Sequence, residues 1–405
     1  MSLEETADQL AGHLKRQEFV EVYAHHDADG IAAASILCMA MARCGVHFRL
    51  RIKERISPAH VSPEVPTLLC DFGSGLDDLP PEVMVVDHHL PHFQGGLHVN
   101  PRLFGIDGDR ELSAAGAAYL VAQAMGDNRD LSGLVMLGIL GDGQELAGVN
   151  LEIFNEGAAE GIITTGRGLR LAGRDDHERL SMAINPYLHQ ISGDEVAVAD
   201  LIESSMADEG LALDTLLSLV ILRISPYATE EAMTSIYGDR LILEREVIPD
   251  APSLTAVVDA CGKEGQGGLA ASLCMRNTEG IAAAWALTLE HRTGVIRTLR
   301  EFGCNGDEDG FFMVGEPRLA SDVADALAWD CQRKGPVFVV ARADELCHIS
   351  ARCPDCAGKN LGEEVRNAAI QCEGFGGGHH TRAGATISCA RLDQFRSHMA
   401  KVMGA

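Results

Sequence analysis

Four acidic turns in the first half of the chain carry side chains that could bind metal ions. They are "HHDADG" with His25, Asp27 and Asp29, "CDFGSG" with Asp71, "VVDHH" with His88 and His89, and "LGDG" with Asp142. Side chains two residues apart share a face in an extended chain, so those of the first turn can converge. Each turn alone has an ordinary reading as a polar loop or as a cap of a turn or helix. Four such turns, each at the end of an apolar segment, instead indicate one shared site.

Carboxylates gathered at one place need a counter-charge, because like charges repel strongly at short range. Two divalent cations would supply that charge, with three or four ligands each. A mixture of oxygen and imidazole ligands favours Mn²⁺ over Mg²⁺, which remains the alternative. Two metals about 3.5–4 Å apart are the usual arrangement for displacement at phosphorus, where they activate water and neutralise developing charge. These residues therefore predict a two-metal phosphoesterase centre.

A second group of residues, near the C-terminus, could bind phosphate. It consists of Gly376, Gly377, Gly378, His379 and Arg382 in "GFGGGHHTRAG". Consecutive glycines let the backbone approach a ligand closely and leave amide groups for phosphate oxygens. Arg352 in "ISARC", at the expected end of a strand, is predicted to be a second anion clamp. A flexible hinge is the other reading of the glycines, although a hinge rarely carries two imidazoles and a guanidinium.

The elements that must position the acidic turns alternate between strands and helices. Strands are expected at 19–25, 47–53, 67–73 and 82–89, and helices at 28–45, 113–126 and 131–144. Such alternation predicts an α/β fold with a mainly parallel sheet sandwiched by helices. Ligands of these sheets bind beyond the carboxyl ends of the strands, which is where most of the polar residues lie.

The length of 405 residues indicates two domains and a connector. We expect an N-terminal domain at 1–190, a helical and acidic connector at 191–249, and a smaller C-terminal α/β domain at 250–405. No apolar run reaches eighteen residues and the start is charged, which argues against a membrane span or a signal peptide and for a cytoplasmic protein.

The net charge of −26 argues against a protein that coats long duplex nucleic acid. The charge is uneven, because residues 331–405 contain 10 Lys and Arg against 7 Asp and Glu, a balance of +3. Three arginines in "GRGLRLAGR", Arg167, Arg170 and Arg174, could track a nucleic acid backbone or lie in a solvated loop. The C-terminal part could therefore face a polyanion.

The twelve cysteines are mostly scattered singly through apolar segments, as reduced thiols are. The one close pair is Cys353 and Cys356 in "CPDC". A zinc site there would need two more ligands, and Cys347 and Cys372 are the nearest candidates.

Taken in order, "HHDADG", "DFGSG", "VVDHH" and "LGDG" resemble the four motifs of the DHH phosphoesterase superfamily. "GFGGGHHTRAG" resembles the glycine–histidine motif of the DHH-associated C-terminal domain. The resemblance covers nearly the whole chain, and "NPRLFGIDGDRELSAAGAAYLVA" is similar to archaeal RecJ-like proteins. It implies a catalytic domain at 1–190, a substrate-binding domain at 250–405 and an active site in the cleft between them.

The resemblance also implies a role for each residue. His25, Asp27 and Asp71 would hold one metal, and Asp29, Asp71, His88 and Asp142 the other, with Asp71 bridging. His89 would bind the scissile phosphate, and His379 would meet the substrate from the C-terminal domain. The family spacing His-x-Asp-x-Asp selects His25 over His26.

The leading prediction is a manganese-dependent RecJ-like exonuclease that releases mononucleotides from single-stranded DNA or RNA. The alternative is a phosphoesterase for short substrates, such as oligoribonucleotides, pAp or cyclic dinucleotides. The acidic charge and the aromatic content of 5% do not indicate a long binding groove. A third hypothesis is a scaffold of replication assemblies, and a replication or repair partner is compatible with catalysis.

Overall fold

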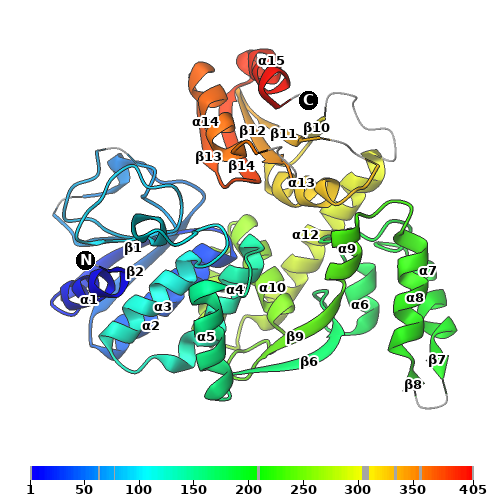
Figure 1. The fold of residues 1–405 in the computed structure, drawn as a ribbon, viewed down its shortest axis with the longest axis horizontal. Coiled ribbons are helices and arrows are strands. Elements are labelled where there is room, and N and C mark those ends of the chain that lie inside the picture. Colours follow the sequence, from blue (N-terminus) through cyan, green and yellow to red (C-terminus); the bar gives the residue numbers. More distant parts are fainter. Residues whose placement is uncertain are drawn as a thin grey trace. The chain divides into compact units, whose positions relative to one another are not determined.

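The computed structural model describes residues 2–62, 64–76, 78–207, 210–302, 310–332, 335–354 and 358–403. They form two compact units, each built from two stretches of the chain (Figure 1). The first unit comprises Met1–Gly166 and Arg240–Thr288, and the second Arg167–Asp239 and Leu289–Ala405. The expected segments 1–190, 191–249 and 250–405 divide the chain differently, because residues 240–288 return to the first unit.

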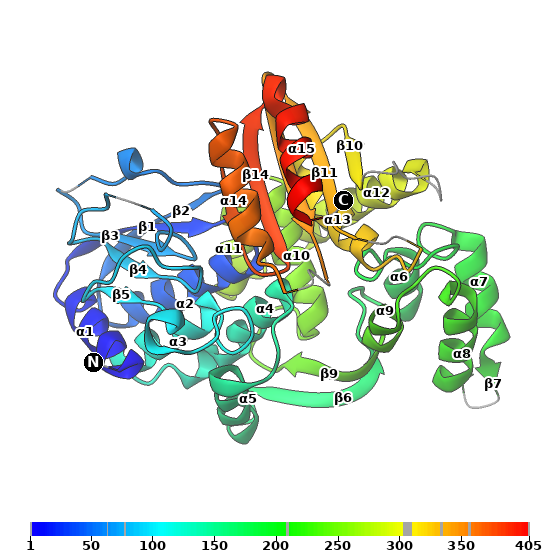
Figure 2. The same cartoon turned by 45° about the horizontal axis from the view of Figure 1, so that its top comes forward.

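The first unit contains a five-stranded parallel sheet in the order β2-β1-β3-β4-β5 (Figure 2). Its strands are β1 (Phe19–His25), β2 (His47–Lys53), β3 (Thr67–Cys70), β4 (Met84–Val86) and β5 (His98–Val99). The register pairs Ala24 with Cys70 and Cys70 with Val86. The carboxyl ends of β1, β3 and β4, which carry three of the four acidic turns, therefore lie at one edge of the sheet.

Side chains of this sheet alternate between two faces, as strand geometry requires. On β3, Leu68 and Cys70 enter the main core, whereas Leu69 enters a smaller apolar cluster on the other face. The main core is completed by α1 (Leu3–Leu14), α2 (Ala28–Arg43), α3 (Ala114–Met125), α4 (Ser132–Asp142), α5 (Gly148–Ala159), α10 (Ala251–Lys263) and α11 (Gly267–Cys274). The other face is covered by connecting segments, including Phe72 and Phe93. The expected α/β fold with a parallel sheet is thus confirmed; in the described residues the helices of the main core lie on one face of this sheet.

The second unit contains a five-stranded mixed sheet in the order β10-β11-β12-β14-β13. The strands are β10 (Phe311–Val314), β11 (Val337–Ala343), β12 (Leu346–Arg352), β13 (Phe375–Gly378) and β14 (Arg382–Ser388). On β11, Phe338 and Val340 face a core shared with α14 (Leu361–Gln371) and α15 (Leu392–Met403). Val337 and Val339 face a core shared with α13 (Ala320–Ala328) and the last part of α12 (Ile281–Phe302). Figure 2 shows α14 and α15 together on one side of this sheet.

The rest of the second unit is mainly helical. It contains α6 (Asp176–Ser181), α7 (Glu195–Ser204), α8 (Leu213–Ile224) and α9 (Glu230–Ser235), with a small pair β7 (Met206–Ala207) and β8 (Gly210–Leu211). These helices form a core of their own. One strand was missed there: β9 (Tyr237–Leu243) pairs with β6 (Ile163–Leu169) in a two-stranded sheet (Figure 1).

Two further expectations can be compared with the described residues. Their cysteines are free thiols, and most are buried, as the scattered pattern predicted. None of their helices combines the length and the apolar character that a membrane crossing needs.

An ion-pair network joins the two stretches of sequence that form the first unit. Asp130 pairs with Arg43 at the end of α2 and with Arg276 beyond α11, each at 2.7 Å. Arg276 also contacts the buried Glu246 at 3.1 Å. Partial burial opposes ionisation of Asp130, but Arg43 and Arg276 outweigh it and lower its pKa from 3.8 to about 2. The Asp130 carboxylate is therefore a contact that holds residues 240–288 on the first unit.

Replacing Asp130 by Asn should destabilise the protein in a pH-dependent manner. Because the folded-state pKa is lowered, the stabilisation is complete above pH 4 and is lost as the pH falls toward 2. At neutral pH we expect a loss on the order of 1 kcal/mol in unfolding free energy. Urea unfolding of both proteins between pH 2 and pH 7 measures this difference.

Asp127→Asn is the matched control, because the Asp127 side chain is 70% exposed and forms its ion pair with the nearby Arg129. A difference between wild type and Asp130→Asn that stayed constant across this pH range would contradict the assigned role of Asp130.

Candidate metal centre

The first acidic turn links β1 to α2. Asp27 is the N-cap of α2, and its Oδ1 accepts a hydrogen bond from the Gly30 backbone at 3.0 Å. Its other oxygen, Oδ2, lies 2.7 Å from Nδ1 of His25, the last residue of β1. One oxygen of the Asp27 carboxylate thus caps the N-terminus of α2, and the other faces the edge of the sheet.

Asp29 lies in the first turn of α2, and its carboxylate is held by another helix. Its two oxygens accept hydrogen bonds from the backbone amides of Ala114 and Ala115, each at 2.8 Å, in the first turn of α3. A helix N-terminus favours negative charge, so α3 stabilises this buried carboxylate. Gly138 on α4 makes room for it, because a Cβ there would lie 2.0 Å from Asp29 Oδ1.

Asp71 follows β3 directly and has a left-handed backbone with φ 58°. Asp tolerates this conformation better than most residues, and strained backbone of this kind is concentrated at functional sites. The Asp71 side chain is 1% exposed, and its Oδ1 accepts no hydrogen bond within the described residues. Nitrogens of His88 and His89 lie 3.4 and 3.5 Å from that oxygen.

Asp87, which follows β4, organises the turn that carries His88 and His89. Its Oδ1 accepts the backbone N–H groups of His88 and His89 at 2.8 and 3.1 Å, and its Oδ2 accepts that of Ser74 at 2.9 Å. The same Oδ1 lies 2.8 Å from His89 Nδ1. Burial works against ionisation, but the imidazoles and the Ser74 amide hold the pKa of Asp87 well below its usual value. Asp87 is thus an anchor of the turn, a role that its sequence position did not reveal.

His88 is fully buried and its ring orientation is fixed from outside the cluster. Nδ1 lies 2.6 Å from the Gly108 carbonyl oxygen, which a protonated Nδ1 would use as acceptor. Nε2 then points to the carboxylates, at 3.2 Å from Asp142, 3.4 Å from Asp71 and 3.6 Å from Asp29. Asp142 is the last residue of α4, and Gly143, with φ 65°, is the C-cap of this helix.

The geometry distinguishes His25 from His26. His25 Nδ1 lies within 3.3 Å of both Asp27 and Asp71. His26 takes no part in any group of described side chains arranged to hold a metal. Burial, together with the neighbouring His25, lowers the pKa of His26 to about 3, so its ring is neutral.

Two groups of three side chains are each compact enough to hold a metal ion. Within each group the ligand atoms lie no more than 4.8 Å apart, and the groups are His25–Asp27–Asp71 and Asp29–His88–Asp142. They contain the residues that the resemblance implies as ligands, with Asp71 in the first triplet only. Burial and repulsion from Asp142 and Asp71 raise the pKa of Asp29 well above its usual value. This electrostatic conflict, and the buried Asp71 oxygen without a hydrogen-bond donor, are what a divalent cation would resolve. The residues therefore fit bound metal ions.

The remaining six predicted residues lie in the second unit. Gly376, Gly377 and Gly378 belong to the edge strand β13. Gly377 and Gly378 have φ of 156° and 147°, which side chains disfavour. His379 follows in the turn before β14, and its backbone N–H donates to the Arg382 carbonyl at 2.7 Å.

The start of α14 secures this turn. The backbone amides of Leu361 and Gly362 donate to the carbonyls of His380 and His379 at 2.9 and 3.0 Å. Gly362 has no room for a side chain, because a Cβ would lie 2.4 Å from the Gly378 carbonyl oxygen. The glycine–histidine turn is therefore a fixed structure.

Arg352, the last residue of β12, is buried in the second unit. Its guanidinium donates to both oxygens of Asp325, to Ser321 Oγ and to the Ala351 carbonyl. The contacts leave this side chain 9% exposed. Arg382 is 28% exposed and contacts the same Asp325 at 3.5 Å.

Two of the three arginines that could track a nucleic acid backbone are paired with acids. Arg167 contacts Asp239 at 3.2 Å and lies over the Tyr237 ring, and Arg174 pairs with Glu178.

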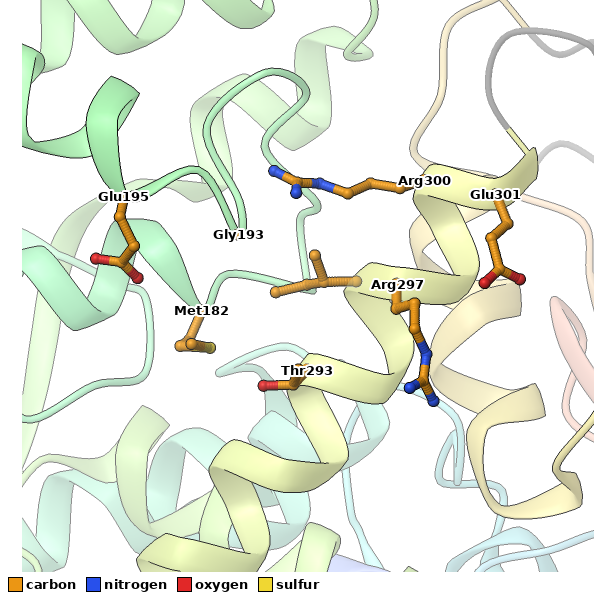
Figure 3. A pocket seen from close by; sticks show the side chains of 8 residues that line it. Met182, Gly193, Glu195, Thr293, Arg297, Arg300 and Glu301 are labelled. Carbon is orange, nitrogen blue, oxygen red and sulfur yellow. The ribbon is translucent and has the colours of Figure 1, made fainter.

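A cavity of about 400 Å³ in the second unit is lined by side chains of both charges (Figure 3). Its lining consists of Met182, Gly193, Glu195, Thr293, Ile296, Arg297, Arg300 and Glu301, none of which is a predicted site residue.

Whether Cys353 and Cys356 form part of a zinc site stays open, because Cys356 lies outside the described residues. Among the residues that are described, the metal-capable groups contain His and Asp only.

Comparisons with known proteins agree with the motifs and the fold. The family model of the DHHA1 domain matches residues 315–405. An uncharacterized protein of Methanocaldococcus jannaschii is 25% identical over 420 residues, which cover 96% of this chain and 94% of the relative. The structure of Thermus thermophilus RecJ in complex with Mn²⁺ has a TM-score of 0.63 at 20% identity and covers 99% of this chain. The chain thus contains a DHHA1 domain and shares the fold of RecJ structures.

The chain spans 54% of the Thermus thermophilus RecJ chain. A structure of exonuclease RecJ bound to manganese is 19% identical, with a TM-score of 0.54, and covers 100% of this chain and 94% of that one. The fold is shared more widely, because CDC45 from Entamoeba histolytica has a TM-score of 0.61 at 11% identity, with 100% and 99% of the two chains covered.

Replacing Asp71 by Asn should weaken Mn²⁺ binding about 100-fold or more, because both ligand sets would lose an anionic oxygen. Asn suits the left-handed backbone at this position, so the folded structure should persist. Isothermal titration calorimetry with Mn²⁺ measures the change. Asp8→Asn, in an exposed position of α1, is the matched control. Unchanged Mn²⁺ affinity in Asp71→Asn would exclude Asp71 as a ligand.

His88 and His89 should respond differently to replacement by Ala. His88 points its Nε2 into the carboxylates, so His88→Ala should lose metal affinity. His89 is held by Asp87 and is 32% exposed, so His89→Ala should keep Mn²⁺ affinity within about 3-fold and lower turnover by about 10²-fold. Calorimetry and a hydrolysis assay on the same samples separate the two effects. Loss of a metal ion from His89→Ala would reverse the assignment.

Proposed function

We propose that this protein is a two-metal phosphodiesterase that degrades single-stranded nucleic acid as an exonuclease and releases mononucleotides. The observation that carries the proposal is the convergence of seven side chains at the carboxyl edge of one parallel sheet. They are His25, Asp27, Asp29, Asp71, His88, His89 and Asp142. The fold likeness to manganese-bound RecJ structures supports the same reading.

In this proposal His25, Asp27 and Asp71 hold one cation, and Asp29, Asp71, His88 and Asp142 hold the second. When bound, the two cations supply positive charge to phosphate oxygens and activate water for attack at phosphorus. Mixed oxygen and nitrogen ligands favour Mn²⁺, with Mg²⁺ as the alternative.

The protein side chains orient the reacting groups. The Gly108 carbonyl fixes the ring of His88, so that Nε2 stays directed at the carboxylates. Asp87 holds His89 through Nδ1, which orients that ring to contact the scissile phosphate. The α3 amides keep Asp29 in place and stabilise its charge in a buried setting.

The DHHA1 domain would bind the substrate through its glycine–histidine turn. His379 and Arg382 are proposed to contact phosphate groups there, with the edge strand Gly376–Gly378 close to the backbone of the substrate. A partner protein of replication or repair is compatible with this arrangement, given the fold likeness to CDC45.

A length series of substrates tests the function. We expect the protein with Mn²⁺ to degrade 5′-labelled single-stranded DNA or RNA of two to thirty nucleotides, with activity that persists as length increases. Gel analysis of the products would show a ladder and its polarity. Asp71→Asn serves as the inactive control.

Activity confined to the shortest substrates would replace the proposal with a short-substrate phosphoesterase. No cleavage at any length, with wild type and Asp71→Asn alike, would indicate a non-catalytic scaffold.

A further inference from the structure

Two arginines face each other across neighbouring strands of the DHHA1 sheet. Arg352 ends β12, Arg382 begins β14, and the antiparallel register pairs them directly. Like charges in directly opposed positions destabilise a strand pair. The pair at this end of the sheet therefore requires a counter-charge.

Asp325 on α13 supplies that charge to both arginines. Its Oδ1 and Oδ2 accept hydrogen bonds from Nε and Nη2 of Arg352 at 2.6 and 3.1 Å. The same Oδ1 lies 3.5 Å from Nη2 of Arg382. Burial alone would raise the pKa of Asp325, but Arg352 and Arg382 hold it below its usual value, so the carboxylate stays ionised.

The carboxylate divides its contacts unequally between the two guanidinium groups. Arg352 receives a two-oxygen contact, is further bound by Ser321 and Ala351, and is 9% exposed. Arg382 receives one longer contact and is 28% exposed. Because charged groups committed to a buried network cannot leave it cheaply, Arg352 is suited to brace the strand end. Arg382 has the exposure that contact with a ligand needs.

The position of Arg382 connects it with the glycine–histidine turn. Its carbonyl oxygen accepts the backbone N–H of His379 at 2.7 Å. The backbone of Arg382 therefore helps to set the turn, while its side chain is set by Asp325. Movement of either would affect the same small region of the DHHA1 domain.

We propose that Asp325 is a positioning residue, which locks Arg352 as a brace and directs the Arg382 guanidinium to a phosphate of a single-stranded oligonucleotide. The inference rests on the proposed function, because it refines how the DHHA1 domain contacts that substrate. It also separates the two arginines that the sequence presented as equivalent anion clamps. Without the Asp325 carboxylate, repulsion from Arg352 would turn Arg382 away from its bound direction.

A double-mutant cycle on oligonucleotide binding tests this coupling. The probe is a 5′-fluorescein single-stranded DNA of twelve nucleotides, and its anisotropy is followed in low salt, with EDTA and separately with Ca²⁺. Asp325→Asn and Arg382→Gln should each weaken binding about 10-fold, as loss of a charged hydrogen bond to phosphate predicts. The double variant should bind about as weakly as Arg382→Gln alone, because Asp325 acts through Arg382.

Additive losses, about 100-fold in the double variant, would overturn the inference, since Asp325 would then act independently of Arg382. Unchanged binding by Asp325→Asn would overturn it too, as would a wild-type protein that binds the probe in neither condition. Asp393→Asn is the matched control, because it removes one exposed carboxylate of α15 in the same domain. It should bind like the wild type.

Thermal melting of each variant establishes that it is folded. If Asp325→Asn does not fold, Arg382→Gln decides alone, and unchanged binding by that variant overturns the inference. The assay requires no hydrolysis, so the two proposals fail separately. A protein that shows the coupling yet cleaves nothing loses the proposed activity, and a protein that cleaves without the coupling loses only the role of Asp325.

Discussion

Repulsion among buried carboxylates is the constraint on which the first unit depends. Asp29, Asp71 and Asp142 all lie within 3.6 Å of one imidazole nitrogen, that of His88. Such crowding is costly unless positive charge is supplied. The protein meets part of the cost with the amides of α3, which bind Asp29. The repulsion that these amides leave uncompensated would destabilise the fold, and bound cations would offset it.

The backbone of the first unit is shaped to keep these charges together. Parallel register places the ends of β1, β3 and β4 at one edge, so that residues far apart in sequence meet there. Residue 138 is a glycine, so that no side chain there displaces the Asp29 carboxylate. Asp71 has a left-handed backbone conformation. Both features lower the local stability of the fold, as is expected where backbone strain serves a functional site.

Much of this arrangement could be predicted, because strand–turn–helix units leave strong local signals. The strands before His25, Asp71 and Asp87 lie where apolar runs ended in acidic turns, and Ser113 caps α3 as its position indicated. The anchoring role of Asp87 and the association of residues 240–288 with the first unit depend on tertiary contacts that no local pattern encodes. Gly138 left only a weak local signal, as a glycine within an apolar helix that other residues would favour more strongly.

The distribution of charge bears on how such a protein can hold a polyanion with a net charge of −26. Arg167, Arg174 and Arg352 are each matched to an acid within the second unit, so they add little to long-range attraction. Affinity for a phosphate backbone would then rest on a few short-range contacts, because screening weakens all others at physiological salt. A carboxylate that sets the direction of a single guanidinium, as Asp325 is placed to do for Arg382, matters more in this setting than in a broadly basic groove. Affinity for the phosphate backbone would then depend on the precise placement of a few charges and not on a large number of them.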